Sequence, residues 1–333
     1  MPILTLSPRA TTHITARSLG IALAACLAVP AALAADYPAK PVTLVVPFPA
    51  GGITDSVARL VAKELGDSWK QTVLVDNRPG ASGAIGTEAV ARAPKDGYTV
   101  LFTITSHIQL PALNPKLRYD ALKDFEPVSQ VALSSSILAV SPAFPVNSAK
   151  DLIAKLKAEP DKHAYGSYGM GTTSNIYGEV FKKEAGVSLT HVPYKGSAPL
   201  VNDLLGGVLN IAFVDTGTAM PHLKAGKIKP LAIIGTRRSG VLPAVPTFAE
   251  AGLKGFEPYA WMGILMPAGT PPAVVQKMAT EVKRIVNDPA TQKRLIEWNL
   301  EPVASTPAEF SATLRKDSQT WKQVIELGGV KLE

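Results

Sequence analysis

A strand, a glycine-rich turn and a helix start follow one another near the amino terminus, and this stretch constrains the fold most. The apolar run Val42–Val46 leads into the turn Pro47–Gly52 and then into an amphipathic segment, Ser56–Leu65. Gly51 and Gly52 let the backbone approach a ligand closely, and a helix start offers unpaired N–H groups at the positive end of its dipole. The stretch predicts a βα unit with a site for a small anion.

The rest of the chain repeats this alternation of short apolar runs and amphipathic segments. Such a pattern is typical of βαβ units with largely parallel sheets, so we expect an α/β fold. Two extended segments, 125–142 and 259–266, flank the middle of the chain and predict two hinge crossings between two lobes. We expect residues 35–135 and 260–333 to form the first lobe, and residues 136–259 to form the second.

Residues 1–34 have the pattern of a secretory signal peptide. Arg9 and Arg17 give a basic start, residues 19–29 form an apolar core, and residues 32–34 are a small-residue cleavage site. The apolar core is shorter than the ~18 to 20 residues that span a bilayer. We therefore expect export to the periplasm with cleavage near Ala34.

The cysteine at position 26 allows a second interpretation of this segment. Leu23–Cys26 resembles the lipobox at which bacterial lipoproteins are cut and acylated, although the apolar run continues past Cys26. The sequence leaves open whether Cys26 is lipidated. Cleavage near Ala34 would leave no cysteine for a disulfide or a thiol nucleophile.

The charge of the chain is mildly basic and scattered. The formal net charge is +7, and loss of residues 1–34 would lower it by two, because that segment holds two arginines and no acid. The densest basic pairs, Lys182-Lys183 and Arg237-Arg238, have no interleaved aromatic residues, which argues against nucleic acid as a partner. A basic balance favours small anionic ligands.

Two further turns combine glycine with short side chains. Gly80–Gly86 has a glycine at every third position, which differs from the G-x-G-x-x-G loop of dinucleotide sites and fits a carboxylate cradle at Ala81 and Ser82 better. Gly169–Asn175 leads into a second helix, where its short donors either bind a ligand or only cap the helix. For Asp55 we favour a role in fixing the helix start, because a carboxylate would repel an anion.

No catalytic, metal-binding or nucleotide-binding motif is recognisable in the sequence. The four histidines after residue 34 lack metal-ligand spacing, and Ser106 and His107 are neighbours at an expected strand end, so they point in opposite directions. Asp215 follows an apolar run, at the strand end where α/β sheets present ligand groups. We therefore expect a protein that is not an enzyme and has no metal and no cofactor, with Asp215 as a candidate for the cleft.

A series of motifs in this order resembles the Bug-type (TctC) substrate-binding proteins of tripartite tricarboxylate transporters. The match covers the whole chain after residue 36. The motifs are Tyr37-Pro38, Val46–Gly52 with Asp55, Asn77–Ala81, Asp96–Thr99, His191–Gly196, Asp203–Gly207 and Leu242-Pro243 with Val245–Thr247.

The resemblance implies a type II-like periplasmic binding protein whose two lobes close on a ligand. It implies that main-chain amides and bridging waters of the first lobe hold a ligand carboxylate, and that the second lobe sets selectivity. The candidate ligand-binding residues are Phe48, Ala50, Gly51, Gly52, Ala81, Ser82, Ser106, Gly171, Thr172, Thr173, Ser174, Asn175 and Asp215. Tyr177 replaces a small residue of many relatives and is expected either to stack on a flat ligand or to lie in the core.

The function we expect is capture of a small organic carboxylate between two lobes, for uptake by a tripartite tricarboxylate-type transporter. The protein would act as a monomer with membrane transporter subunits as partners. An alternative is an extracytoplasmic sensor that partners a membrane kinase, and a secreted hydrolase is less favoured.

Overall fold

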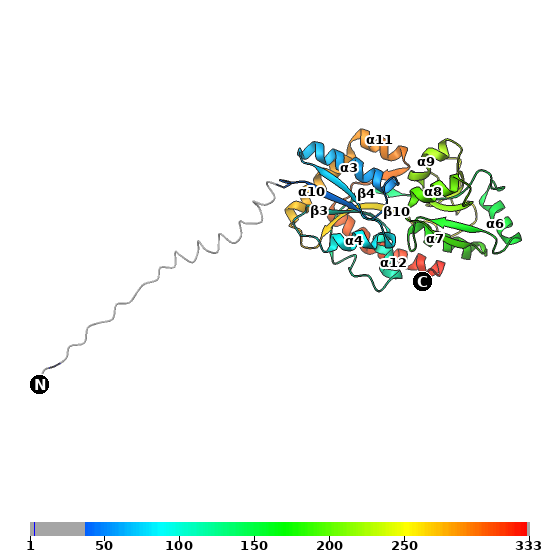
Figure 1. The fold of residues 1–333 in the computed structure, drawn as a ribbon, viewed down its shortest axis with the longest axis horizontal. Coiled ribbons are helices and arrows are strands. Elements are labelled where there is room, and N and C mark those ends of the chain that lie inside the picture. The colour runs from blue at the N-terminus through cyan, green and yellow to red at the C-terminus, as the bar shows by residue number, and fades with distance from the viewer. Residues whose placement is uncertain (1–2, 4–36, 332–333) are drawn as a thin grey trace.

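Two sheets, each covered by helices on both faces, form the molecule (Figure 1). The computed structural model describes residue 3 and residues 37–331. The expected signal peptide, its cleavage site and Cys26 lie outside these residues. No helix within them is long and apolar enough to cross a bilayer.

The first sheet has six strands in the order β11-β4-β10-β3-β1-β2. Strands β1, β2 and β3 are parallel, while β10 runs antiparallel to β3 and β4. Their bounds are β1 Val42–Val46, β2 Val73–Asn77, β3 Thr99–Ile104, β4 Phe125–Ser134, β10 Ala260–Pro267 and β11 Leu300–Pro302. The carboxyl ends of β1, β2 and β3 therefore meet at one edge of the sheet.

The second sheet has five strands in the order β7-β6-β8-β5-β9, in which β6 is parallel to β7 and β8. Their bounds are β5 Ser136–Val140, β6 Ala164–Ser167, β7 Thr190–Pro193, β8 Ile211–Asp215 and β9 Lys229–Ile233. The middle block of the chain thus forms a sheet of its own, as the alternation predicts.

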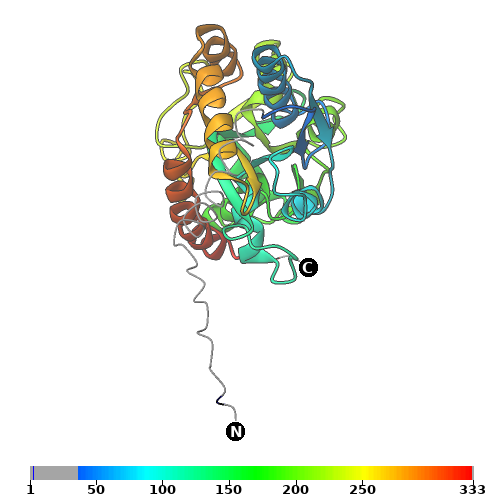
Figure 2. The same ribbon diagram turned by 90° about the vertical axis from the view of Figure 1, so that its left-hand side faces the viewer.

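The helices are placed by their apolar faces. On the first sheet, α3 and α10 pack over Leu44 and Phe102, while α5 and α12 pack on the opposite face over Leu101 and Leu265. In Figure 2, α10, α11 and α12 stand in a column along one side of the molecule. The helices are α3 Ile53–Trp69, α4 Ala84–Ala91, α5 Ser106–Leu113, α6 Ala149–Ala158, α7 Thr173–Ala185, α8 Ser197–Leu205, α9 Thr216–Lys224, α10 Pro272–Asn287, α11 Pro289–Glu297 and α12 Pro307–Gly328.

The chain crosses between the sheets at two places. The first crossing is Ser135, between β4 and β5, and the second is the segment 234–259, between β9 and β10. Ser135 Oγ donates a hydrogen bond of 2.6 Å to Ile234 O, which ties the two crossings together. This agrees with the expected bilobed α/β fold with two hinge crossings.

The carboxyl-terminal helix α12 contacts both parts of the molecule. Phe310 packs edge-to-face on Trp261 of the first sheet, and Trp321 packs on Tyr177 of α7 beside the second sheet. Tyr177 is fully buried, stacks on Phe256 and donates a hydrogen bond to Pro258 O, so it is a core residue. Of its two expected roles, the structure supports the core.

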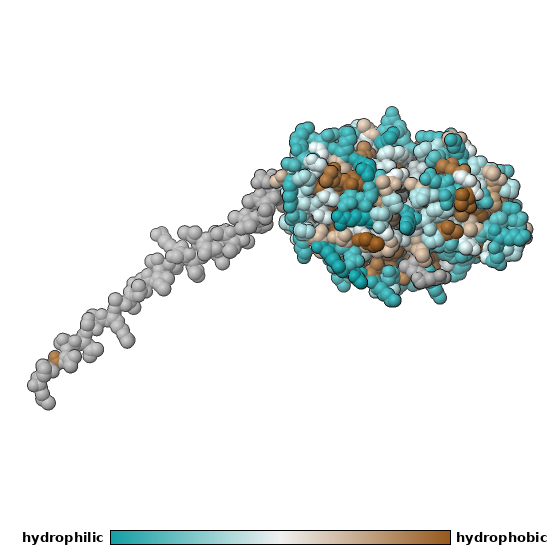
Figure 3. Space-filling model, viewed as in Figure 1, coloured by the Kyte–Doolittle hydropathy of each residue, from teal (hydrophilic) through white to brown (hydrophobic). Residues whose placement is uncertain are grey.

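The face of the molecule seen in Figure 3 is largely polar, with scattered apolar residues. Val208 and Ile85 are the most exposed large apolar side chains within residues 37–331, and they lie far apart in sequence. Single exposed apolar side chains are ordinary in soluble folds.

Candidate functional site

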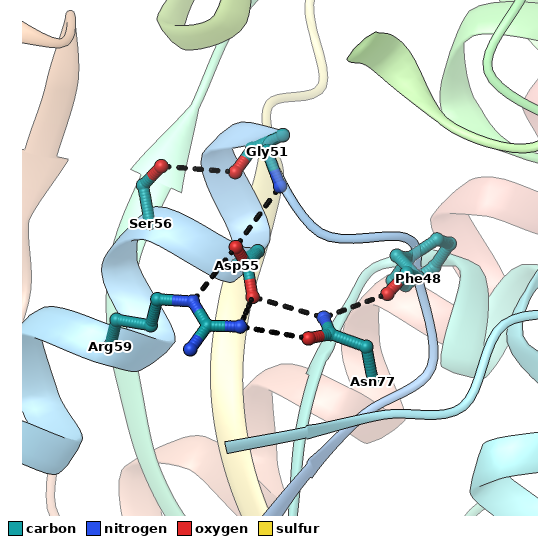
Figure 4. A network of polar contacts seen from close by, with 7 residues as sticks. Phe48, Gly51, Asp55, Ser56, Arg59 and Asn77 are labelled. Carbon is teal, nitrogen blue, oxygen red and sulfur yellow. Dashed lines mark hydrogen bonds and ion pairs between the residues drawn. The ribbon is translucent and has the colours of Figure 1, made fainter. Parts of the chain in front are cut away.

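The loop between β1 and α3, residues 47–52 (the α3 loop), is held from behind by a polar network (Figure 4). Asp55, in the first turn of α3, accepts hydrogen bonds from Gly51 N, from Asn77 Nδ2 and from Arg59 Nε, each at 3.0 Å. Asn77 also donates to Phe48 O at 3.0 Å. The network fixes both ends of the loop while Arg59 lies outward at the surface.

This network stabilises the ionised form of the Asp55 carboxyl. Burial alone would raise the pKa of the Asp55 carboxyl, but the hydrogen bonds from Arg59, Gly51 N–H and Asn77 outweigh it, and its pKa lies below the ordinary value. Asp55 therefore supports the helix start, as we favoured from the sequence. A negative charge at this end also suits the helix dipole.

The loop after β2, residues 80–83 (the Gly80 loop), has an unusual backbone. Gly80, Ala81, Ser82 and Gly83 all have positive φ, with values of 45° at Ala81 and 54° at Ser82. Residues other than glycine adopt this left-handed region rarely, and consecutive residues in it are rarer still. A backbone held in this way is suited to direct its amides at a ligand.

The loop between β6 and α7, residues 168–172 (the α7 loop), uses its polar side chains on itself. Thr172 Oγ1 donates to Gly169 O at 2.7 Å, and Ser174 Oγ accepts from Tyr168 N at 3.0 Å. Asn175 Oδ1 accepts from Gly171 N at 2.8 Å. These buried groups bond within the loop and stabilise the turn into α7, while the N-cap residue Thr172 makes no side-chain cap hydrogen bond.

Two lobes meet across these loops. Ile53 N donates to Thr218 Oγ1 of α9 at 3.0 Å, and Gln109 Nε2 donates to Thr173 Oγ1 at 3.0 Å. A β-carbon built on Gly169 would lie 2.9 Å from Ser82 Oγ, so only glycine allows this approach of the α7 loop to the Gly80 loop. The structure is thus one in which the lobes touch.

Among the pockets within residues 37–331, two lie between the lobes at the α3, Gly80 and α7 loops. The first, with a volume of about 40 Å³, lies at the α3 helix start. The second, of about 430 Å³, lies between the Gly80 and α7 loops. Phe48, Pro49 and Tyr168 line both, so these three side chains separate one pocket from the other. The smaller pocket has room for a few water molecules.

Asp215 lies in the smaller pocket, at the carboxyl end of β8. Its Oδ1 accepts a hydrogen bond of 2.7 Å from Thr218 N, which caps α9. Burial raises the pKa of the Asp215 carboxyl, and the nearby hydroxyl of Ser197 and the N–H of Thr218 oppose that rise. The side chain thus has a structural role in capping and also faces the space between the lobes.

The candidate residues fall into three groups: those that line a pocket, those that are exposed, and those that are buried away from both pockets. Phe48, Gly52 and Asp215 line the small pocket, and Phe48, Ala81 and Ser82 line the larger one. Ala50 and Gly51 are exposed on the α3 loop. The others are buried and line neither pocket: Ser106, Gly171, Thr172, Thr173, Ser174 and Asn175.

Ser106 and His107 differ from the expected geometry. They begin helix α5 rather than ending a strand. Both are buried, His107 Nε2 lies 2.8 Å from Ala121 O, and burial lowers the pKa of His107 to about 4. A neutral, enclosed histidine of this kind belongs to the packing of the first lobe.

Sequence reasoning missed several residues that shape the site. Thr218 and Tyr168 meet the first-lobe loops from the second lobe, and no motif marks them. His191 Nε2 lies 2.7 Å from Ser167 Oγ, and the same Oγ accepts from Gly169 N at 3.3 Å. The pair holds the α7 loop from behind, and the position of Ser167 at the end of β6 was the available signal.

The family model of the "Tripartite tricarboxylate transporter family receptor" (TctC) matches residues 57–330. The chain belongs to this family. It is also 35% identical to protein BugT of Bordetella pertussis over 299 residues, covering 89% of this chain and 92% of BugT.

Solved structures support the same assignment. A structure titled "R. palustris Rpa4515 with adipate" has a TM-score of 0.86 and 35% identity, covering 89% of this chain and 99% of that one. MatC of Rhodopseudomonas palustris, solved with malate, has a TM-score of 0.83 and 31% identity, covering 87% and 100%. The chain is therefore a TctC-family solute-binding protein with the periplasmic binding protein fold.

Proposed function

We propose that this TctC-family receptor captures a small organic carboxylate between its lobes and delivers it to a tripartite tricarboxylate-type transporter. The observation that carries the proposal is the meeting of the α3, Gly80 and α7 loops across two pockets. The adipate and malate in the two related structures support a carboxylate as the ligand class. Export to the periplasm, with cleavage near Ala34, is part of the proposal.

The first lobe is proposed to hold the carboxylate through main-chain N–H groups. The α3 helix start brings the positive end of a dipole, and the left-handed Gly80 loop brings amides that are already oriented. Lys195, which lines the larger pocket, is the only Lys or Arg lining either one within residues 37–331. The first-lobe hold on the carboxylate would therefore depend on dipoles and hydrogen bonds rather than on an ion pair.

Release and capture are proposed to require movement of the lobes. A pocket of about 40 Å³ is too small for a dicarboxylate, so the lobes would part at the contact of Ile53 with Thr218 and close again on the ligand. The crossings at Ser135 and residues 234–259 would bend. We propose binding without chemical turnover, with the protein as a monomer.

The test is thermal unfolding of the purified protein with and without a panel of carboxylates, followed by mass analysis of each compound after incubation. We expect at least one carboxylate to raise Tm and to be recovered unchanged. Conversion of the compound would overturn the proposal. Copurification with a histidine kinase instead of small transporter subunits would favour the sensor alternative.

A further inference from the structure

One oxygen of Asp215 stands out among the polar atoms of the molecule. Asp215 is only 6% exposed, and while Oδ1 accepts from Thr218 N, Oδ2 has no hydrogen-bond partner within residues 37–331. A buried acceptor without a partner is costly, and an ionised one more so. The fold keeps this oxygen at the small pocket between the lobes.

Within residues 37–331, no Lys, Arg or His lines the small pocket beside Asp215. Asp215 is the only charged residue that lines the small pocket, and no ion pair joins it to another side chain within the described part of the chain. Besides the Thr218 N–H bonded to Oδ1, the polar groups around the carboxylate are the hydroxyls of Ser197, Thr218 and Tyr168. None of them supplies a positive charge.

The pocket therefore has two ends of opposite character. At the first-lobe end, Ile53 N–H at the start of the 17-residue helix α3 donates to Thr218 Oγ1. At the second-lobe end, Asp215 Oδ2 has no hydrogen-bond partner within residues 37–331. Thr218 bonds to both, through its hydroxyl at one end and its N–H at the other, so the two ends lie close together.

We propose that Asp215 determines specificity by accepting a hydrogen bond from the ligand, and that the ligand is an amino-carboxylate whose ammonium meets Oδ2. This rests on the proposed function, in which the first lobe holds the carboxylate of the same ligand. An ammonium both donates the missing hydrogen bond and neutralises the buried charge. A second ionised carboxylate at this position would instead be repelled.

The inference separates this protein from a receptor for plain dicarboxylates. Matched pairs of compounds test it, because each pair exchanges one terminal group and keeps the carbon chain similar. The pairs are malonate and β-alanine, succinate and 4-aminobutanoate, glutarate and 5-aminopentanoate, and adipate and 6-aminohexanoate. Affinity is measured by titration calorimetry at neutral pH.

We expect at least one amino-carboxylate to bind the wild type about tenfold or more tightly than its dicarboxylate partner, the range of a hydrogen bond to a charged group. Asp215→Asn keeps the acceptor for Thr218 N and removes the charge, so it should abolish most of that preference. Asp67→Asn removes the same charge from an exposed position and should leave the preference intact.

The outcomes separate this inference from the proposed function. Tighter binding of the dicarboxylate in every pair that binds would overturn the role of Asp215 and leave the carboxylate receptor standing. Absence of binding by all eight compounds would count against both. The wild-type comparison decides the matter even if Asp215→Asn does not fold, and an unchanged preference in a folded Asp215→Asn would also overturn the inference.

Discussion

The α3 loop and the α7 loop are both turns from a strand to a helix, yet they treat their polar groups in opposite ways. The α3 loop is supported from behind by Asp55 and Asn77, and its own residues are mostly glycine, proline and alanine. The α7 loop is supported from within, because Thr172, Ser174 and Asn175 bond to their own loop. The number of short donor side chains at a helix start therefore does not show how many of them can reach a ligand.

This difference places recognition on different atoms in the two lobes. In the first lobe the proposed contacts to the carboxylate are main-chain amides, which suit many carboxylates. In the second lobe the residues that line the small pocket come from the end of β8, the start of α8 and the α7 loop, among them Asp215, Ser197 and Tyr168. The comparison can be tested by removing the support of each loop in turn.

The largest effect is expected from removing the support of the α3 loop. Asp55→Ala removes the acceptor of the Gly51 N–H and of Asn77 Nδ2. It should lower the free energy of unfolding by about 3 kcal/mol. Urea unfolding at pH 7 measures it. The control is Asp67→Ala, which breaks an exposed ion pair with Lys63 at the same helical spacing and should leave the midpoint unchanged. Equal midpoints for the two variants would show that the network does not hold the loop.

A smaller loss is expected in the α7 loop. Asn175→Ala removes the acceptor of the buried Gly171 N–H and a donor to Tyr165 OH, and should cost about 2 kcal/mol. Gln276→Ala, which truncates an exposed amide on α10, serves as the control and should stay within about 0.5 kcal/mol of the wild type. If Asn175→Ala matched Gln276→Ala, the α7 loop would not depend on its own side chains.

The sequence predicts the fold better than the site, and the reason is physical. Alternating apolar runs determine which segments enter a sheet, so both sheets and both crossings were confirmed. The sequence predicts one extended segment at 125–142 with the lobe boundary after residue 135, and the structure has two strands there, β4 and β5, with Ser135 between them. The packing of α12 on α7 was missed, since periodicity shows that a helix has an apolar face and not what covers it.

Within the site, backbone properties were easier to predict than partners. Gly51, Gly52 and the Gly80 loop can be recognised in the sequence, because glycine is typical of positive φ and of close approach of the backbone to a ligand. The contact of Ile53 with Thr218 joins residues far apart in the chain, and no local pattern carries such information. The hydroxyls of Thr172 and Ser174 were candidate ligand donors because their partners within the loop, Gly169 O and Tyr168 N–H, cannot be seen in the sequence.

The two loops should also respond differently to acid. Burial and Lys182 lower the pKa of His191 to about 4 against the opposing charge of Glu179. His191 is thus neutral when folded but binds a proton more readily when unfolded, so its contribution is complete above pH 6.5 and is lost as the pH falls toward 4. The folded state lowers the pKa of Asp55, so the stability that Asp55 contributes is lost at a lower pH, as the pH falls from the ordinary carboxyl pKa through the lowered one.

His191→Gln tests this difference. The variant should lose less stability than the wild type between pH 7 and pH 5, by about 1 kcal/mol after allowance for solvent around the partly exposed ring. Urea unfolding at both pH values measures the slope, and His107, which has the same sign of shift, is present in both proteins. If the free energy of unfolding changed equally between pH 7 and pH 5 in the variant and the wild type, His191 would not be held neutral behind the α7 loop.

The smallest effect is expected at Ser82, where the side chain differs from the backbone in its role. Ser82 Oγ has no hydrogen-bond partner within residues 37–331, whereas its backbone has a φ of 54° in the Gly80 loop. Ser82→Ala keeps this backbone and should change stability by less than about 0.5 kcal/mol. If the first lobe grips a carboxylate through main-chain amides, any compound that stabilises the wild type should bind Ser82→Ala within about twofold, a difference below 0.5 kcal/mol. A tenfold loss of affinity would show that the Ser82 hydroxyl binds the ligand. The Gly80 loop would then resemble the second lobe in contacting the ligand through a side chain.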